Sequence, residues 1–483
     1  MPDSTHADAA VQFESAERRV EERSGVLKKE LGLGSLVLTQ ILYVVGLTWV
    51  GVAGKLGPPH VVFWLLAITL FYVPSAAVVI HLSGRMPLEG GLYQWAKLSF
   101  NEFTGFMVAW NLWLFVIINT SELGLLVGTF VHYALGERFA WMPESKWFAA
   151  ASDVAVVGLL VLVSSVGLRV GKWVHNAGAV VMLCIFATLL ALPLVHLAGG
   201  TIPSYRPLAT ALPVVSLFSL NILGKMGFGA MGGFEYVAIL AGECRSPARA
   251  IGRSVLIAAP LIALMFILGT SSVLAFVRPE EIDLIGPIPQ VLSIGFRSFG
   301  AVAYVVSAAI LLTLLLRLAQ ASVIFTPVTR LPMVAGWDHL LPEWFSRVHP
   351  RYRTPVNSIL LVGGVSLALG LLSLVGAGQQ EAFQLLFSSN GIIYGLTYLV
   401  MFAIPIVGLR GVEPRPPLWL RVASVSGFLM TLLFVVLSVF PIIEVQNRAA
   451  FTFKVSAVIV LSNALGAALY LLGRRRARTG ASR

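Results

Sequence analysis

The chain has 483 residues, of which 57% are hydrophobic and only 12% are charged. A soluble domain carries about 25% charged residues, so this composition excludes a water-soluble globular protein and indicates a lipid bilayer as the solvent. The net charge of +11 would suggest nucleic acid as the partner of a soluble chain, but here Lys and Arg lie in short loops and tails, which is typical of membrane topology.

Apolar segments predict an all-α polytopic membrane protein with twelve spans, because one span needs about 20 mostly apolar residues. The predicted spans lie near residues 33–56, 61–83, 103–132, 148–168, 173–197, 213–242, 254–277, 298–329, 355–375, 382–409, 418–441 and 452–473. The sixth and eighth of these are long for single spans, so we expect them to be broken, tilted or extended into a loop. The polar first 30 residues predict no cleavable signal peptide.

The distribution of Lys and Arg predicts the orientation. With the N-terminus in the cytoplasm, 24 of the 34 Lys and Arg residues fall on the cytoplasmic side and eight on the other side. This bias predicts that both termini are cytoplasmic, and the compact loops suit a bacterial inner (plasma) membrane. Cys184 lies in a span and Cys244 in a cytoplasmic loop, so no disulfide is expected.

Glycine interrupts two of the predicted spans. The first span contains Gly46, Gly51 and Gly54, and the sixth contains Gly224, Gly227, Gly229, Gly232 and Gly233. Glycine weakens a helix and exposes its backbone polar groups. Close packing of small residues explains the first span equally well, but five glycines within ten residues exceed what packing requires.

The positions of these two spans predict an inverted repeat. If helices 1–5 and 6–10 are two inverted copies, the interrupted helices correspond, and such pairs point to the central site of a secondary transporter. An unwound turn leaves N–H groups that attract a carboxylate and carbonyl groups that accept an ammonium, which suits a zwitterion. The predicted organisation is a cytoplasmic tail over 1–30, repeats over 31–200 and 201–410, helices 11 and 12 over 411–473, and a basic tail over 474–483.

Three motifs give the chain a specific resemblance. In the first motif, residues 87–95 read PLEGGLYQW and precede Gly105-Phe106 and Trp110. The second motif ends helix 6 and consists of Gly233-Phe234-Glu235, Ala241-Gly242-Glu243 and Ser246-Pro247. In the third motif, Thr329-Arg330 is followed by Asp338, Leu341-Pro342, His349-Pro350 and Thr354-Pro355. In this order the motifs resemble the amino acid–polyamine–organocation (APC) superfamily of permeases. The resemblance implies a five-plus-five inverted repeat of the leucine-transporter type with two extra C-terminal helices, alternating access, and amino acid or amine substrates.

The chain departs from this family pattern at three positions. The small-residue turn of helix 1 is represented by Gly46-Leu47-Thr48, without its third small residue. A Lys that some proton-coupled members carry in helix 5 is Met182 here, so its role would fall elsewhere. Arg317 occupies the part of helix 8 where sodium-coupled relatives of the fold place small hydroxyl residues, and it argues against a sodium site.

Four charged residues fall deep inside predicted spans, at least seven residues from either end: Glu122, Lys225, Glu235 and Arg317. Each costs about 2.5 kcal/mol or more at mid-bilayer unless it is paired or hydrated. Depth places Glu122 level with Lys225, and Glu235 and Arg317 both nearer the inner side, so one interpretation is a pair of structural salt bridges. In the other, Arg317 replaces the sodium ion of relatives, and a coupling proton belongs to one of the other three, because a guanidinium does not release its proton.

The residues expected to contact substrate come from the two interrupted spans. They are Val45, Gly46, Thr48 and Trp49 in helix 1, and Phe228, Gly229, Met231, Gly232 and Phe234 in helix 6. Packing or lipid contact is an equally good interpretation for any one of them. No metal or other cofactor is expected, and the partners are a small-molecule substrate and the bilayer, with no nucleic acid. A small membrane subunit or a second copy of the chain stays open.

Together these features predict a secondary active permease that moves amino acids, with neutral ones preferred, independently of sodium and with a proton as the candidate coupling ion. Lys225 and Arg317 disfavour polyamines unless both acids face the ligand. Amino acid or amine exchange, polyamine or organocation transport, and a nutrient sensor that binds without transport are the alternatives. The chain carries no phosphate-binding loop and no metal-ligand cluster, so an enzyme is not expected.

Overall fold

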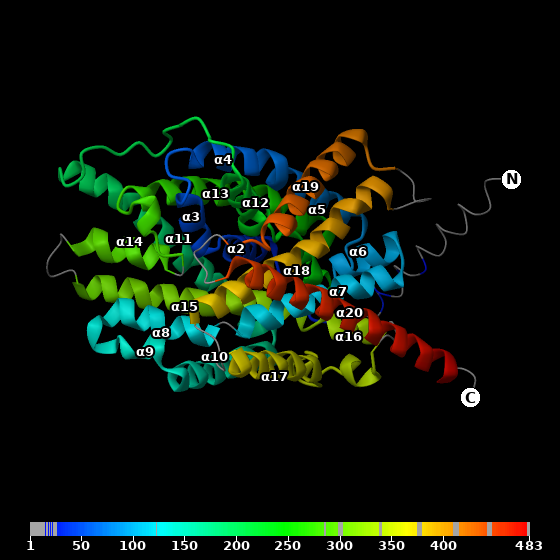
Figure 1. Ribbon diagram of the computed structural model, residues 1–483. Helices are drawn as coiled ribbons and strands as arrows, with labels where there is room; N and C mark the ends of the chain where they lie inside the picture. The colour runs from blue at the N-terminus through cyan, green and yellow to red at the C-terminus, as the bar shows by residue number, and fades with distance from the viewer. Residues whose placement is uncertain are drawn as a thin grey trace.

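The computed structural model shows a bundle of helices (Figure 1) and describes residues 15, 18, 20, 22, 27–121, 123–284, 286–297, 303–337, 341–373, 379–408, 415–441 and 447–480. Among these residues the only β pairing is an isolated bridge between Leu31 and Cys244. The predicted all-helical class is therefore confirmed for the described part of the chain. Two residues that the sequence singles out, Glu122 and Asp338, lie outside the described residues.

The helices of the first half have the following bounds: α2 Leu33–Val44, α3 Leu47–Gly54, α4 His60–Ala67, α5 Val73–Arg85, α6 Leu92–Ser99, α7 Glu102–Ser121, α8 Leu123–Leu135, α9 Trp141–Glu144, α10 Lys146–Val166 and α11 Leu168–Ala198. Those of the second half are α12 Leu217–Gly224, α13 Pro247–Leu274, α14 Pro287–Phe296, α15 Ala303–Val328, α16 Leu331–Trp337, α17 Val356–Ser373, α18 Gln379–Val407, α19 Leu418–Leu437 and α20 Arg448–Gly480. Ile68–Tyr72 and Lys225–Gly229 are π-helical, and Glu137–Phe139, Phe234–Glu243, Pro279–Glu281 and Glu343–Ser346 are 3₁₀-helical.

Long apolar helices make the molecule a multi-pass membrane protein. Within the described residues, nine helices are long and apolar enough to cross a bilayer, and α2 with α3 forms a tenth if the bent pair is one span. Large apolar side chains such as Leu162, Leu256 and Leu461 are more than half exposed. Since water would not tolerate such a surface, lipid covers it.

The two glycine-interrupted segments are discontinuous in the structure. α2 and α3 are bent by 43° at Val45 and Gly46. The predicted sixth span is no single helix: the eight-residue α12 leads into a π-helical turn, and a 3₁₀ segment follows Gly232 and Gly233. The helix α14, in a loop between predicted spans, was not predicted because ten residues are too few for a span.

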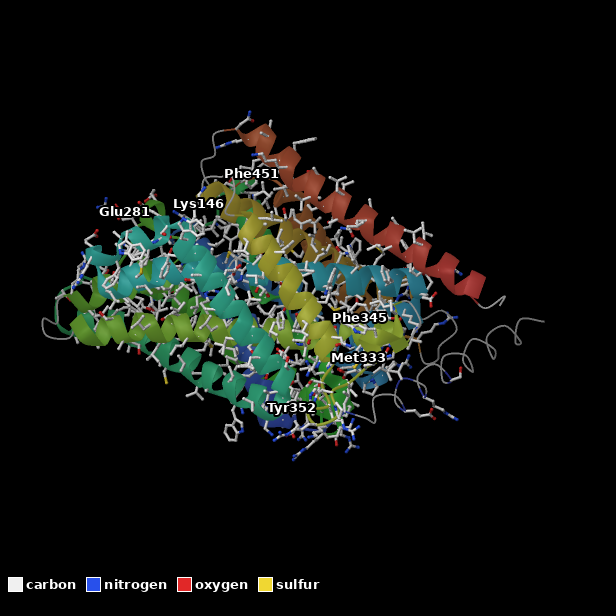
Figure 2. The ribbon with its side chains drawn as sticks, turned by 90° about the horizontal axis from the view of Figure 1, so that it is seen from below. Lys146, Glu281, Met333, Phe345, Tyr352 and Phe451 are labelled. Carbon is white, nitrogen blue, oxygen red and sulfur yellow. The ribbon has the colours of Figure 1, made fainter. Side chains whose placement is uncertain are left out.

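The interrupted helices lie inside the bundle, whereas α17 and α20 lie on its outside (Figures 1 and 2). α6, α16 and the end of α20 share one end of the bundle, and α9 and α14 lie at the other end (Figure 1). Figure 2 shows the same separation, with Lys146 and Glu281 toward one end and Met333 and Phe345 toward the other. Only 17% of the most apolar stretch of α20 is buried inside the protein, so this helix mostly contacts lipid.

The loop between α5 and α6 packs directly against the 3₁₀ segment Phe234–Glu243. Gly90 N–H donates to the Ile239 carbonyl at 3.0 Å. Gly91 has φ +47°, and a Cβ atom there would lie 2.7 Å from the backbone of Ala238. Glycine is therefore required at position 91 by the close approach of two backbones as well as by its conformation.

We expect Gly91→Ala to lower stability by about 1–3 kcal/mol, because a side chain there is strained and meets immovable backbone atoms. Gly84→Ala is the matched control, since a Cβ at that helical position meets nothing within 4 Å. The measurement is the apparent melting temperature of the purified protein in detergent. Equal melting temperatures for the two variants would contradict this account of the loop.

Candidate substrate cavity

A cavity of about 170 Å³ lies where the two interrupted helices face α7, α8, α15, α18 and α19. Its wall is formed by Tyr43, Val44, Gly46, Thr48, Trp49, Phe115, Asn119, Leu123, Leu126, Lys225, Phe228, Gly229, Gly232, Arg317, Gln320, Ala321, Ile324, Phe387, Ser388, Asn390, Gly391, Tyr394 and Phe434. A hollow of this size with apolar walls and a few polar groups suits a small ligand.

Trp49 occupies the space that glycines leave at both helix breaks. A Cβ at Gly46 would lie 2.5 Å from the indole Cδ1, and a Cβ at Gly229 would lie 2.6 Å from Cη2. The indole ring also faces Phe387, with ring centroids 5.4 Å apart. Part of the glycine pattern therefore has a packing cause, because Gly46 and Gly229 make room for one large side chain in the cavity wall.

Two polar side chains of α15 hold the first break. The Gln320 amide donates to the carbonyl oxygens of Leu42 at 2.9 Å and Val45 at 2.8 Å. Arg317 donates from Nη2 to the Thr48 hydroxyl at 2.7 Å, in the first turn of α3. The bent chain thus obtains hydrogen-bond partners that the interrupted helix itself cannot supply.

This arrangement changes the expected chemistry at helix 1. The sequence predicts free carbonyl groups that accept an ammonium, but Leu42 and Val45 already accept from Gln320. At the other side of the break, the first N–H groups of α3 have no partner within their helix, and the guanidinium of Arg317 lies beside them. The first break is consequently rich in donors and suits a carboxylate.

Two tyrosines of α18 hold the second break. The Tyr398 hydroxyl accepts from the Gly233 N–H at 2.5 Å and donates to the carboxylate of Glu235. Tyr394 donates to the other oxygen of Glu235 at 2.5 Å and lies 3.2 Å from the Tyr43 hydroxyl. Because Tyr43 and Tyr394 line the cavity, a continuous chain of hydroxyl groups joins it to the buried Glu235.

Lys225 lies in the cavity wall and has no carboxylate partner among the described residues. Its Nζ donates to the Ser438 hydroxyl at 3.3 Å and lies 5.6 Å from the ring centroid of Phe434. Among the cavity-lining residues that the structure describes, Lys225 and Arg317 are cationic and none is acidic. The described wall therefore favours a ligand with negative charge at this level.

The structure brings six of the nine predicted substrate residues to the cavity, namely Gly46, Thr48, Trp49, Phe228, Gly229 and Gly232. Val45, Met231 and Phe234 are buried outside its wall, where Val45 accepts from Gln320 and Phe234 stacks on Tyr72. Contact of any of these residues with substrate stays a prediction.

One of the two salt bridges considered from the sequence, between Glu235 and Arg317, does not form, whereas the other, between Glu122 and Lys225, stays a prediction. Glu235 pairs with tyrosine hydroxyls and not with Arg317, and Lys225 makes no ion pair with a described residue. Glu122 lies outside the described residues. Depth along a helix axis failed as a guide because it says nothing about the direction in which a side chain points, and because neutral donors can satisfy a buried charge.

Sequence reasoning missed Gln320, Tyr394 and Tyr398. All three lie on apolar helices, where a lone polar residue is as often a link between helices as part of a site. The spacing of Tyr394 and Tyr398, four residues apart, places both on one face of α18 and could have indicated a shared partner.

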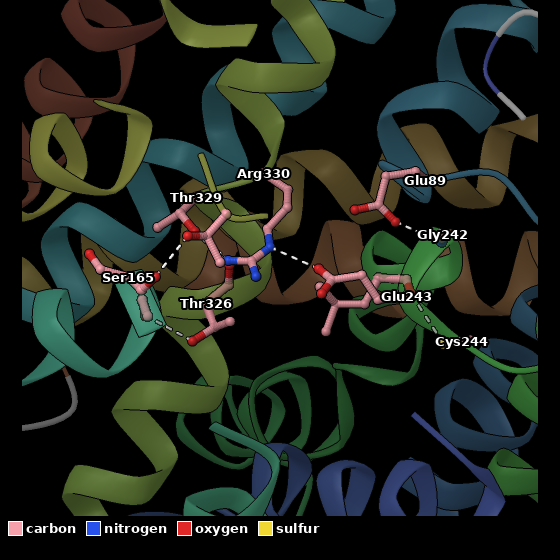
Figure 3. Close-up of polar contacts among 11 residues, drawn as sticks. Glu89, Ser165, Gly242, Glu243, Cys244, Thr326, Thr329 and Arg330 are labelled. Carbon is pink, nitrogen blue, oxygen red and sulfur yellow. Dashed lines mark hydrogen bonds and ion pairs between the residues drawn. The ribbon is translucent and has the colours of Figure 1, made fainter. Parts of the chain in front are cut away.

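A cluster of Glu89, Glu243 and Arg330, here called the inner cluster, lies at the α6–α16 end of the bundle (Figure 3). Arg330, almost fully buried, donates to Glu243 at 3.0 Å and to the Thr326 carbonyl at 3.0 Å. The Gly242 N–H donates to Glu89 at 2.7 Å. The ion pair joins the end of the 3₁₀ segment, at Glu243, to the turn after α15, at Arg330.

A bundle of lipid-facing helices that encloses a cavity between two interrupted helices is the architecture of a membrane transporter. A sequence model of the amino acid permease family matches residues 31–462. The chain belongs to this family, and thereby to the amino acid–polyamine–organocation transporters that its motifs resemble.

Relatives in this family differ in cargo. An uncharacterized transporter of Legionella pneumophila is 24% identical over 81% of this chain and 83% of its own length. The probable agmatine/putrescine antiporter AguD of Lactococcus lactis is 20% identical, over 83% of this chain and 84% of its own. The low-affinity putrescine importer PlaP of Escherichia coli is 26% identical, over 71% of this chain and 74% of its own length. Family membership therefore leaves the substrate class to be decided by the cavity.

We expect Tyr398→Phe to destabilise the protein by about 1–3 kcal/mol, because it leaves the Gly233 N–H without an acceptor and removes a donor from Glu235. Tyr72→Phe is the matched control: its ring is also buried, but its hydroxyl has no hydrogen-bond partner among the described residues. Thermal unfolding in detergent measures both. An equal effect of the two substitutions would show that the Tyr398 hydroxyl does not hold the break.

Proposed function

We propose that this permease carries amino acids, with neutral ones preferred, by alternating access and without sodium. The observation that carries the proposal is Arg317, whose guanidinium lies on Thr48 at the start of α3 and lines the cavity. A fixed cation at the N-terminus of a helix suits a substrate carboxylate and occupies the place of a bound metal cation.

Polyamine transport is the second candidate, because AguD and PlaP are named for agmatine and putrescine. A dication needs carboxylates in its site, and the described cavity wall carries Lys225 and Arg317 instead. Glu235 lies behind the wall and is engaged by two tyrosines. These contacts favour a substrate with a carboxylate over a polyamine.

The proposed topology has twelve spans, with both termini in the cytoplasm of a bacterial cell and helices 1–5 and 6–10 as inverted repeats. Its support is the excess of Lys and Arg on one side and the position of the two interrupted segments, which open each proposed repeat and border the same cavity. The end of the bundle with α6 and α16 then faces the cytoplasm. The proposed repeats span 31–200 and 201–410, followed by helices 11 and 12.

Counterflow of labelled amino acids in proteoliposomes tests the proposed function. We expect exchange of a neutral amino acid without sodium and no exchange of putrescine. Arg317→Gln should reduce uptake about tenfold or more, because a charge-assisted hydrogen bond to the substrate carboxylate contributes about 1.5–3 kcal/mol. Arg317→Lys should restore part of the activity.

Arg421→Gln is the charge-matched control, because this exposed arginine of α19 lies outside the cavity wall. Uptake by this variant should equal that of the wild type. Putrescine counterflow that survives Arg317→Gln would support the polyamine alternative, and binding of amino acids without any counterflow would support a sensor.

We further propose Glu235 as the group that carries a coupling proton, since the hydroxyl groups of Tyr394 and Tyr43 connect it to the cavity. Glu235→Gln should abolish the stimulation of uptake by an inward proton gradient while counterflow continues. The measurement compares both assays on the same proteoliposomes. Gradient-driven uptake that persists in Glu235→Gln would assign the coupling proton to another group.

A further inference from the structure

The inner cluster holds two carboxylates against one guanidinium. Glu243 takes the ion pair with Arg330 at 3.0 Å, and both side chains are buried. Glu89 is equally buried and has one donor, the Gly242 N–H, while its Oε1 has no hydrogen-bond partner among the described residues. Figure 3 shows Glu89 directed at the Gly242–Glu243 turn, with Arg330 on the far side of Glu243. The charge of Glu89 is therefore poorly compensated while the cluster is closed.

The groups that face Glu89 come from three segments. Glu243 and Cys244 end the 3₁₀ segment, Arg330 follows α15, and Lys29 belongs to the N-terminal segment. Lys29 is exposed, so water screens its charge. Burial, followed by repulsion from Glu243, raises the pKa of Glu89 well above its usual range.

Backbone hydrogen bonds join the N-terminal segment to the end of the 3₁₀ segment Phe234–Glu243, which we call the gate. The Glu243 carbonyl accepts from the N–H groups of Glu30 at 3.0 Å and Leu31 at 3.1 Å, and the Arg245 N–H donates to Leu31 at 2.9 Å. In the proposed alternating access, opening of this end moves the end of the 3₁₀ segment away from Glu89 and Arg330. Such a movement hydrates both carboxylates at once.

We propose that Glu89 is a proton-binding site on the cytoplasmic gate, occupied while the gate is closed and emptied when it opens. The inference rests on the proposed orientation and on alternating access. The sign follows from linkage: the closed gate binds one more proton than the open gate. Closure is fully favoured below the ordinary carboxyl pKa of about 4.3 and is lost as the pH rises through the raised pKa of the closed state. An acidic cytoplasm thus holds the gate shut.

Cys244 provides a reporter inside the gate. Its thiol is buried and lies 3.2 Å from the Leu240 carbonyl, and burial raises the thiol pKa above its usual value. Cys184 is the only other cysteine of the chain, so Cys184→Ser leaves a single labelling site. A membrane-impermeant maleimide, added to the cytoplasmic face of inside-out vesicles, should label Cys244 only when the gate opens.

The experiment compares labelling rates of Cys184→Ser and Cys184→Ser/Glu89→Gln over a series of pH values. All labelling rates rise with pH because the thiolate is the reactive form. The quantity of interest is therefore the rate of Cys184→Ser divided by the rate of Cys184→Ser/Glu89→Gln. We expect the ratio to be constant at low pH and then to rise by up to about tenfold per pH unit, as one linked proton requires. A ratio that is flat or falls with pH would overturn the proposal.

Two further variants make the outcome specific. Glu30→Gln removes a carboxylate at the same end of the protein, one that pairs with Lys172, and its ratio to the parent should not change with pH. Glu243→Gln frees Arg330 to pair with Glu89, so the rise of the labelling-rate ratio should occur at lower pH. A rise at an unchanged pH would exclude Glu89 as its origin. Labelling requires no transported substrate, so failure of this test and failure of the proposed amino acid transport are distinguishable.

Discussion

The structure depends on one constraint: a helix interrupted inside a bilayer exposes backbone groups that lipid cannot satisfy. Each of the two breaks obtains partners from a helix far away in sequence. Gln320 on α15 binds the carbonyl groups of the first break, and Tyr398 on α18 binds an amide of the second. The same residues that make the breaks tolerable also place Arg317 and Tyr394 in the cavity wall, so the cavity is a consequence of how the breaks are stabilised.

This arrangement divides the molecule into parts with different roles. The interrupted segments contact each other through Trp49, which packs against Gly46 and Gly229. α15 and α18 are continuous and hold the breaks from outside. Since the supporting bonds come from side chains, the backbone at each break can change its direction by exchanging a few hydrogen bonds and without unfolding a helix. A transporter that alternates between two accessible states needs an exchange of hydrogen bonds that costs little free energy.

The sequence predicted the features that are local in the chain. Apolar length predicted the helices, and glycine density predicted both breaks, because these depend on neighbouring residues alone. The partners of Glu235 and of the Leu42 and Val45 carbonyls could not be predicted in this way, since Tyr394, Tyr398 and Gln320 approach from positions 159 to 278 residues away in the chain. The salt bridge considered between Glu235 and Arg317 failed for the same reason: depth along a helix constrains one coordinate, and a contact requires three.

Two of the buried carboxylates, Glu235 and Glu89, differ in how their charges are compensated. Both oxygens of Glu235 accept from tyrosine hydroxyls on a continuous helix, so its environment does not require the gate to be closed. Glu89 has a single amide donor, and that donor belongs to the segment that must move. Movement of the gate therefore changes the surroundings of Glu89 far more than those of Glu235. In the proposed mechanism, a proton on Glu235 follows the contents of the cavity, whereas a proton on Glu89 follows the position of the gate.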